Sequence, residues 1–387
     1  MEVFVELLPA LMFGSLLVGM FSGLPVALVL MGIAMIFALL AVLTGEMRLA
    51  QTTLLPHRIF GGTIENPVLV AAPMFILMGL ILEKTRIAED LMTTLQRLLK
   101  VVPGSLAVAV VLVGTILAAA TGIIGASVVM LTVMAIPTMI EKNYSPALAA
   151  GSVASASTLG ILIPPSVMLV FMGDLLGVNL AKLFVAALVP GLFLAFTYIV
   201  YIVFAALLKP GIAPADNTTS SQTPVSDSDK QRLWREAALS VLLPLLLILC
   251  VLGSILGGLA SPTEASGIGV VAALLLGLFR GRISGDVLNQ SMDGSLKTLA
   301  MLFFIFVGAT AFSYVFRSVG GEAFIVETAR GLNLGDWGLL AMMLVIIFIM
   351  GFFFDWIEII LIILPIFAPL VKLINLGDHV ASADMIY

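Results

Sequence analysis

Residues 155–166 read SASTLGILIPPS and interrupt an apolar run that extends from residue 146 to residue 176. Pro164 and Pro165 have no amide hydrogen, and in an α-helix each ring clashes with the carbonyl four residues earlier. A continuous helix would therefore leave the carbonyls of Gly160 and Ile161 without donors. Such groups cost several kcal/mol each in hydrocarbon, unless protein, water or a ligand satisfies them. We therefore predict a broken helix over 146–176.

The break supplies oxygen ligands of the kind that bind cations in secondary transporters. Four hydroxyl groups lie in this stretch: Ser155, Ser157, Thr158 and Ser166. Together with the released carbonyls they suit a small cation, and we place a Na⁺ site near Ser157, Thr158 and Gly160. The second half-helix begins near Pro165, and its positive N-terminal end favours a carboxylate. The alternative is a proline kink whose carbonyls are satisfied by neighbouring helices.

The composition requires contact with lipid. Of the 387 residues, 61% are hydrophobic and 11% are charged, and the mean hydropathy is +1.20; soluble domains carry about 25% charged residues. Many segments reach the roughly 20 apolar residues of a membrane helix, so we predict an all-α, polytopic membrane protein. We expect membrane helices near residues 4–22, 25–43, 67–83, 146–176, 183–208, 236–256, 262–279 and 298–316, and amphipathic segments near 87–100 and 284–297.

The motif content argues against catalysis and against nucleic-acid binding. The sequence has no Walker loop, no GxSxG and no HExxH motif, so ATP hydrolysis and other hydrolytic chemistry are unsupported. It also has no arginine stripe and no interleaving of basic and aromatic residues of the kind that binds nucleic acid. We expect no enzyme activity and no nucleic-acid partner.

A polar linker divides the chain into two parts. Residues 209–231, KPGIAPADNTTSSQTPVSDSDKQ, cannot build a core. The flanking parts, 1–208 and 232–387, suggest a duplicated transporter. With the linker in the cytoplasm, most lysine and arginine residues lie on the cytoplasmic side, as the positive-inside rule requires. Six of the 18 lie on the opposite face: Arg48, Arg58, Lys182, Arg317, Arg330 and Lys372.

The apolar segment 104–141 predicts a re-entrant hairpin. Basic residues flank both of its ends, and its centre reads ATGIIGAS, residues 120–127. Gly122 and Gly125 permit a turn there, while Thr121 and Ser127 offer hydroxyl groups. Two full crossings would need about 40 residues and a turn, so the segment suits a hairpin whose tip reaches the midplane. The alternative is two ordinary helices that pack through their glycines.

Asp355 and Glu358 lie in the apolar segment 351–370, GFFFDWIEIILIILPIFAPL. Ionisable residues inside a membrane are expensive and therefore mark functional sites. Three residues apart, the two acids would share a helix face and could hold a proton, a cation or a basic group of a substrate. The alternative is that both acids meet water at the interface. Glu264, by contrast, follows Ser261 and Pro262 in a pattern typical of a capping box.

The chain carries a series of motifs in a fixed order: GLPVALVLMG (23–32), APMFILMG (72–79), ATGIIGAS (120–127), GSVASASTLGILIPPSVMLVFMG (151–173), SPTEASGIG (261–269) and FFFDWIEIILIILPIFAPL (352–370). In order and spacing they resemble the large membrane subunit (DctM type) of tripartite ATP-independent periplasmic, or TRAP, transporters. The resemblance covers essentially the whole chain. The IPPS element followed by SPTEA is its most specific part.

The resemblance implies an elevator-type carrier of the ion transporter superfamily in the bacterial inner membrane. It implies two inverted repeats, with a hairpin at 104–141 and a broken helix at 146–176 in the first, and a hairpin at 338–371 with its tip near Asp355 in the second. It further implies Na⁺ as the coupling ion with no other cofactor, and a C4-dicarboxylate or similar organic acid as substrate. The implied partners are a small four-helix membrane subunit and a periplasmic substrate-binding protein.

The sequence departs from this family at its end, because the family continues beyond the equivalent of Tyr387 into a second broken helix with a TPP-type motif. We therefore expect a C-terminally truncated second repeat. Two other functions stay open: an ion-coupled antiporter or exchanger that needs no binding protein, and a non-transporting membrane scaffold. A membrane enzyme is the remaining alternative, although no nucleophile–base or metal constellation supports it.

Overall fold

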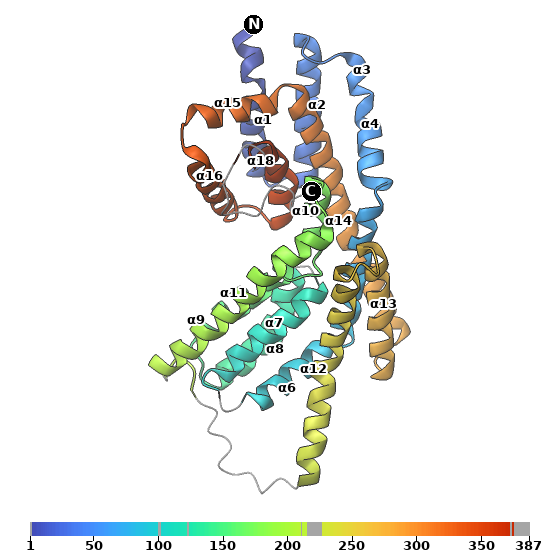
Figure 1. Cartoon of the computed structure of the whole chain (residues 1–387), viewed down its shortest axis with the longest axis vertical. Coiled ribbons are helices and arrows are strands. Elements are labelled where there is room, and N and C mark those ends of the chain that lie inside the picture. The colour runs from blue at the N-terminus through green and yellow to red at the C-terminus, as the bar shows by residue number, and fades with distance from the viewer. Residues whose placement is uncertain are drawn as a thin grey trace. The chain divides into compact units, whose positions relative to one another are not determined.

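The computed structural model describes residues 2–99, 102–121, 124–209, 211–214, 227–371 and 374. In this part of the chain the secondary structure is helical, with no β-strand. Most of the predicted linker 209–231 lies outside the described residues, as do residues 375–387 at the end of the second predicted repeat. Figure 1 shows the arrangement of the helices along the chain.

The helices before the linker have the following bounds: α1 (Glu2–Met20), α2 (Val26–Thr44), α3 (Leu49–Thr52), α4 (Leu54–Ile59), α5 (Ala71–Lys84), α6 (Ile87–Leu98), α7 (Ser105–Thr121), α8 (Ile124–Glu141), α9 (Pro146–Leu162), α10 (Val167–Leu176) and α11 (Leu180–Leu208). A π-helical turn, η1 (Phe60–Ile64), and a 3-10 turn, η2 (Pro67–Val70), join α4 to α5.

The helices after the linker are α12 (Asp227–Leu256), α13 (Pro262–Phe279), α14 (Gly285–Ser318), α15 (Gly321–Gly331), α16 (Gly335–Met350), α17 (Trp356–Glu358) and α18 (Leu364–Val371), with a π-helical turn, η4 (Ile359–Ile363), before α18. The chain divides into two compact units that interleave in sequence. Unit 1 comprises residues 1–69, 171–179 and 296–387, and unit 2 comprises residues 70–170 and 180–295.

Unit 2 is built around α9. The hairpin of α7 and α8 packs on this helix, and α11 lies against both α7 and α9 (Figure 1). In the same unit α5 packs on α13, and α6 packs on α12. Asp90 of α6 accepts hydrogen bonds from Arg280 and Arg282, the latter with an Nη2–Oδ1 distance of 3.0 Å. These interactions connect the amphipathic helix α6 to the segment that directly follows α13.

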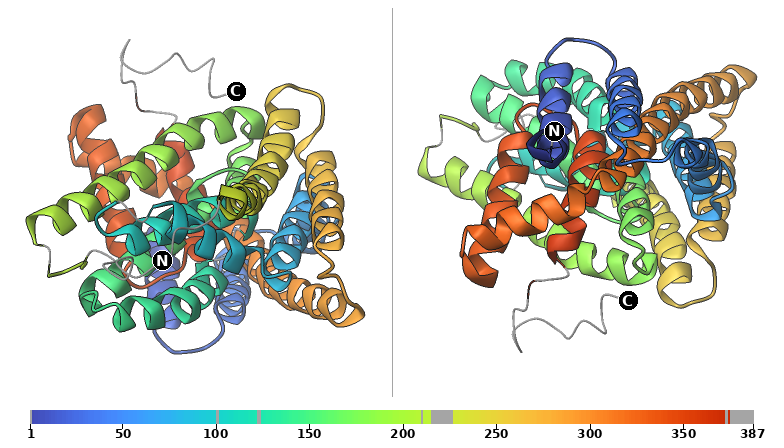
Figure 2. Two further views of the ribbon diagram at one scale, coloured as in Figure 1. Left: turned by 90° about the horizontal axis from the view of Figure 1, so that it is seen from below. Right: turned by 90° about the horizontal axis from the view of Figure 1, so that it is seen from above.

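Unit 1 contains the paired helices α1 and α2, whose short connection is visible in both views of Figure 2. The chain turns back after α16, through residues 351–355, and returns through α17, η4 and α18. This return lies within the range 338–371 that is predicted as the second hairpin, and Asp355 lies at its turn. The second arm packs against α15.

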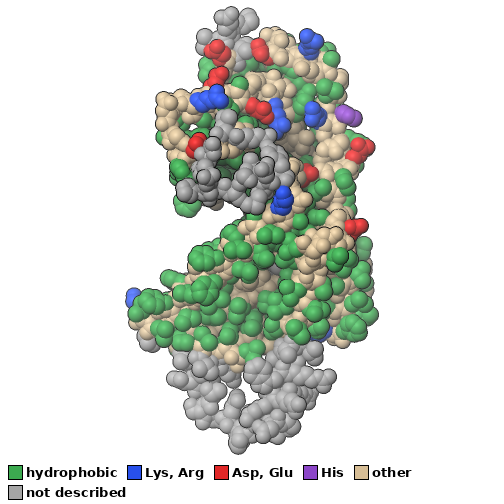
Figure 3. Space-filling model, in the orientation of Figure 1, with side chains coloured by type: hydrophobic (Ala, Val, Ile, Leu, Met, Phe, Trp, Pro, Cys, Tyr) green, Lys and Arg blue, Asp and Glu red, His purple; other side chains and the backbone are tan. Residues whose placement is uncertain are grey.

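Exposed apolar side chains form surfaces that are compatible with a membrane. On α11 they form one stripe at helical spacing, because residues three or four apart share a helix face. The stripe consists of Val189, Phe193, Phe196, Val200, Phe204 and Leu207. Hydrophobic side chains cover the surface of unit 2 that is visible in Figure 3. An apolar surface of this kind marks contact with lipid or with another protein.

Five described helical segments are long and apolar enough to cross a membrane, and two bent helix pairs could raise this number to seven. Two expectations about boundaries were wrong. The segment 284–297 is not a separate amphipathic helix, because α14 runs without interruption from Gly285 to Ser318; at about 1.5 Å per residue it is longer than the hydrocarbon core. Also, α12 begins at Asp227, inside the predicted linker.

The capping box predicted at Glu264 is confirmed. The Ser261 amide donates to Glu264 Oε2 at 2.8 Å, and the Glu264 amide donates to Ser261 Oγ at 3.3 Å. Pro262 takes the first position of α13. This carboxylate therefore has a local role, since it accepts from the Ser261 amide while Ser261 Oγ accepts from the Glu264 amide.

Candidate functional site

The predicted break in 146–176 is present. Helix α9 ends at Leu162, Ile163 is extended with φ −91° and ψ 122°, and α10 begins at Val167. The helix axis turns by 44° across this interruption. The peptide bond between Pro164 and Pro165 is cis, and both prolines are buried. The double proline thus ends one helix and separates it from the next, as its missing amides require.

The hydrogen bonds at the break differ from the expected pattern in one respect. Ser166 is fully buried, and its Oγ donates to the carbonyl oxygen of Ile161 at 2.7 Å. The expectation that Ile161 keeps an unpaired carbonyl was therefore wrong, because a hydroxyl replaces the missing amide. Among the described residues no hydrogen bond reaches the carbonyl oxygens of Gly160 or Leu162. These two oxygens are therefore open at the C-terminal end of α9.

The hydroxyls of the buried Ser157 and the half-buried Thr158 face the helix backbone. Ser157 Oγ donates to the carbonyl of Val153 at 2.8 Å, and Thr158 Oγ1 donates to the carbonyl of Ser155 at 2.8 Å. Such bonds are common for Ser and Thr in membrane helices. Each hydroxyl already donates its only hydrogen, so its oxygen can interact with a further group only as a hydrogen-bond acceptor or a metal ligand.

Ser155 lies apart from the buried hydroxyls. It is half-buried and lines a cavity of about 270 Å³ between α7, α9 and α11, together with Ser152 and Tyr198. Residues two apart point to different faces of a helix, so Ser155 and Ser157 do not converge. The structure therefore groups Ser157, Gly160 and Ser166 in the buried region and leaves Ser155 on a cavity wall.

Two glycines let neighbouring helices approach this region. A Cβ added at Gly114 of α7 would lie 2.7 Å from the Cβ and 2.9 Å from the carbonyl oxygen of Ala156. A Cβ at Gly191 of α11 would lie 2.9 Å from Ile163 Cγ1 and 3.5 Å from the carbonyl oxygen of Leu162. The open carbonyl of Leu162 thus faces a backbone without a side chain.

Two helices, α7 and α8, occupy the segment 104–141, and both the re-entrant hairpin and the alternative of two ordinary helices have this form. Of its candidate residues, Ser127 is buried and Gly125 is exposed. Gly122 and the side chain of Thr121 lie outside the described residues. The hairpin packs on α9, and this contact brings its helices to the broken element within unit 2.

Asp355 and Glu358 have a local structural role. Asp355 is exposed and caps α17, with its Oδ1 accepting from the Trp356 amide at 2.8 Å. Glu358 is half-buried, and its Oε2 accepts from the Asp355 amide at 2.7 Å. The two acids form a capping box at the turn of the second hairpin. They belong to unit 1, whereas the double-proline break belongs to unit 2.

A family model described as "Tripartite ATP-independent periplasmic transporter, DctM component" matches residues 13–387. The chain belongs to this family. As a DctM protein it is the large permease subunit of a TRAP transporter in the inner membrane, and its work is transport and not catalysis. The resemblance inferred from the IPPS and SPTEA elements is thereby confirmed.

Known DctM-family relatives differ in the substrate that their names give. The chain is 32% identical to the C4-dicarboxylate TRAP transporter large permease protein DctM of Pseudomonas aeruginosa, over 80% of this chain and 70% of that protein. It is 29% identical to the ectoine/5-hydroxyectoine permease UehC of Ruegeria pomeroyi, over 91% and 80% respectively. The isethionate permease DctMQ of Oleidesulfovibrio alaskensis is 27% identical over 95% of this chain and 55% of its own length.

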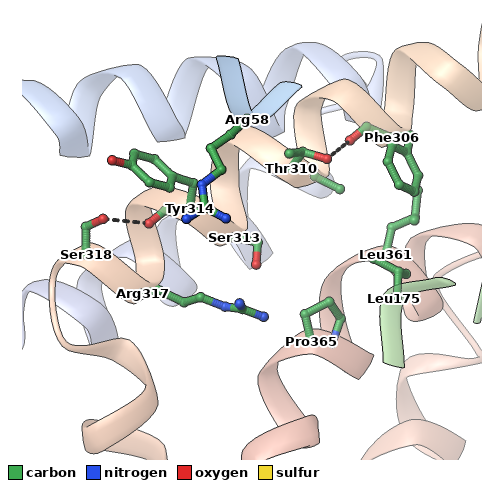
Figure 4. Close-up of a pocket in the computed structure, with 11 residues that line it drawn as sticks. Arg58, Leu175, Phe306, Thr310, Ser313, Tyr314, Arg317, Ser318, Leu361 and Pro365 are labelled. Atoms are coloured by element: carbon green, nitrogen blue, oxygen red, sulfur yellow. Dashed lines mark hydrogen bonds between the residues drawn. The ribbon is translucent and has the colours of Figure 1, made fainter. Parts of the chain in front are cut away.

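Sequence reasoning missed a polar cavity in unit 1 of this DctM protein. A cavity of about 350 Å³ is lined on its polar side by Arg58, Thr310, Ser313, Tyr314, Arg317 and Ser318 (Figure 4). From the sequence, Arg58 and Arg317 were predicted only to lie opposite the cytoplasmic linker. One signal was available, since Thr310, Ser313, Tyr314 and Arg317 recur at intervals of three and four in an apolar helix, which marks one polar face.

Proposed function

We propose that the chain is the translocation subunit of a Na⁺-driven transporter that imports an organic acid. In this proposal a periplasmic substrate-binding protein delivers the acid, and a small four-helix membrane subunit completes the transporter. The inverted repeats are part of the same proposal. The order α5, α6 and hairpin α7–α8 in the first half has a counterpart in α14, α15 and hairpin α16–α18 in the second.

The observation that carries the proposal is the set of oxygens at the C-terminal end of α9. The carbonyls of Gly160 and Leu162 lack donors among the described residues, and Ser157 presents an acceptor oxygen nearby in the chain. The C-terminal end of a helix carries partial negative charge. Open carbonyls at the ends of half-helices coordinate coupling cations in secondary transporters, so this set supports Na⁺ binding.

The names of the relatives support an acid as substrate. A C4-dicarboxylate and ectoine carry carboxylates, and isethionate carries a sulfonate. An anion that moves together with Na⁺ is partly neutralised, which lowers the cost of taking its charge into a low-dielectric environment. The N-terminal end of α10, at Val167, offers the complementary positive end of a helix.

The test is Na⁺-dependent uptake into proteoliposomes that contain this chain with its membrane partner and its binding protein. We expect Ser157→Ala and Thr158→Ala to raise the Na⁺ concentration for half-maximal uptake at least severalfold. Thr197→Ala is the matched control, because Thr197 in α11 makes the same kind of bond, to the carbonyl of Leu194 at 2.7 Å. Unchanged Na⁺ dependence in both break variants would refute the assignment of the ion site.

The same vesicles separate the rival functions. Uptake without the binding protein would favour an antiporter or exchanger. Absence of any uptake by the complete assembly, with the protein folded and inserted, would favour a scaffold. Loss of uptake in the break variants alone, with Thr197→Ala active, supports a carrier whose ion site lies at the end of α9.

A further inference from the structure

The cavity of about 350 Å³ in unit 1 has two chemically different sides. Its polar side comes from α4 and α14, and its apolar side comes from Leu175, Phe306, Leu361 and Pro365. In Figure 4 the side chains of Arg58 and Arg317 point into the space between these sides. Small-molecule sites commonly have volumes of about 300–1,000 Å³ and apolar walls with a few polar groups.

Arg58 brings a positive charge without a counter-ion. Among the described residues it has no ion pair and no hydrogen bond. A hydrogen bond joins the neighbouring helices: Tyr314 of α14 donates its hydroxyl hydrogen to the carbonyl oxygen of Gln51 in α3 at 2.9 Å. The connection places α3, and α4 directly after it, beside the polar face of α14.

Arg317 is only partly neutralised. Its Nε lies 3.1 Å from Glu322 Oε1, and within the described part of the chain its two terminal amino groups have no other partner. Among the described residues Glu322 is the one carboxylate that pairs with either guanidinium group, so one of the two positive charges is unpaired. Ser313 lies between them on the wall of the cavity, and in the described structure its hydroxyl makes no hydrogen bond.

We propose that Arg58, Arg317 and Ser313 form a binding site for an oxyanion group carried on a small organic body. The planar guanidinium fork pairs with two oxygens of a carboxylate or phosphate, and the hydroxyl donates a third bond. The apolar side accepts the rest of the ligand. The choice of an organic acid as its natural ligand rests on the proposed function, whereas the oxyanion chemistry rests on the cavity alone.

The predicted orientation of the chain places this site on the periplasmic side of the membrane, from which the acid arrives. Arg58 and Arg317 both belong to the six basic residues that the positive-inside rule places opposite the cytoplasmic linker. The site is therefore expected to hold the acid on the periplasmic side. An anionic phospholipid headgroup has the same oxyanion chemistry and is the other source of a ligand.

The test measures ligand-dependent thermal stability of the complex of this chain with its small membrane subunit, in phosphatidylcholine nanodiscs and choline chloride buffer. The probes are succinate and benzoate at millimolar concentrations, with succinamide and benzamide as neutral controls. We expect the carboxylates to raise the unfolding midpoint and the amides to leave it unchanged. Ligand-linked stabilisation of this kind reports the apparent affinity.

Three arginine variants make the test specific. Arg58→Gln removes the unpaired charge, and Arg317→Lys keeps a charge for Glu322 but loses the fork, so each should weaken the apparent affinity at least about tenfold. Arg330→Gln makes the same charge change on α15 of unit 1, outside the cavity lining, and should bind as the parent does. Equal affinity in Arg58→Gln, Arg317→Lys and the parent, or no stabilisation of the parent by either carboxylate or by phosphatidylglycerol, would overturn the proposal.

A second arm identifies the source of the oxyanion. Stabilisation by phosphatidylglycerol but not by either acid, lost in Arg58→Gln, would support the site with a lipid headgroup as its ligand. The buffer contains choline and no Na⁺, so the carboxylate shift does not depend on the proposed ion site. A normal carboxylate shift without Na⁺-dependent uptake would refute the transport proposal and support this site. Na⁺-dependent uptake without stabilisation by the acids or by phosphatidylglycerol would support the transport proposal and refute this site.

Discussion

Gly114→Ala tests whether the close contact between α7 and α9 positions the broken helix. The added Cβ would lie 2.7 Å from the Cβ and 2.9 Å from the carbonyl oxygen of Ala156, whereas ordinary contacts begin at 3.4 Å. The two helices would have to separate by roughly 0.5–0.7 Å, since backbone atoms cannot rotate away as a side chain does. The displacement starts four residues before Gly160 in α9.

The magnitude follows from two opposing effects. Overpacking a tight contact costs about 1–3 kcal/mol, whereas replacing glycine by alanine within a helix gains about 0.5–1 kcal/mol. Gly151→Ala in α9 is the matched control, because a Cβ there would have no neighbour within 4 Å. The helical gain is the same in both variants, so their difference isolates the steric cost of about 1–3 kcal/mol.

The assay compares thermal unfolding of the two purified variants in the same membrane mimetic, followed by Na⁺-dependent uptake. We expect Gly114→Ala to unfold about 2–6 °C below Gly151→Ala and to need more Na⁺ for half-maximal uptake. Equal midpoints would show that α7 and α9 are not in close contact at Ala156. A lower midpoint with unchanged Na⁺ dependence would show that the contact stabilises the fold without positioning the ion ligands.

Three further predictions concern other polar contacts. Ser166→Ala removes the buried hydroxyl that serves a backbone carbonyl at 2.7 Å, and should lower the free energy of unfolding by about 1–3 kcal/mol in thermal or chemical denaturation; an unchanged stability would contradict the hydrogen bond. Asp90→Asn weakens a partly buried contact with two arginines and should destabilise by about 1–3 kcal/mol, whereas Glu89→Gln in an exposed pair at 3.8 Å should cost about 0–1 kcal/mol; equal effects would refute this ranking. Glu358→Gln keeps a capping side chain and should preserve uptake, whereas Asp355→Ala should cost about 0.5–2 kcal/mol; loss of uptake in Glu358→Gln would give the acid a role in transport.

Much of the fold could be predicted because its signals are local. The double proline removes two amides, and α9 stops at Leu162 for that reason alone. The apolar runs predicted most membrane helices, and the Ser261–Glu264 spacing predicted a cap that satisfies the first turn of α13. The boundary of α14 was mispredicted, since a long helix can pass from an amphipathic segment into an apolar one without any breaking residue.

The candidate site was harder to predict because its partners are distant in sequence or unexpected. Ser166 was predicted as a cation ligand, and only the structure shows that its hydroxyl hydrogen also completes the hydrogen bonding of Ile161. Asp355 and Glu358 were predicted to share a helix face, yet Asp355 precedes the helix and forms a capping box with Glu358. A pattern of polar residues states which groups are present, but it does not state which neighbour each group binds.

By itself the amino-acid sequence determined a polytopic helical membrane protein, the position of the broken helix and the DctM family. These properties depend on hydrophobic periodicity and on missing amides, which act within a few residues of the chain. Only the tertiary structure decided which carbonyls stay open at the break and that Arg58 and Arg317 line one cavity. The open carbonyls depend on which carbonyl the Ser166 hydroxyl binds. The cavity depends on packing between segments more than 250 residues apart, which the spacing of residues in the sequence does not reveal.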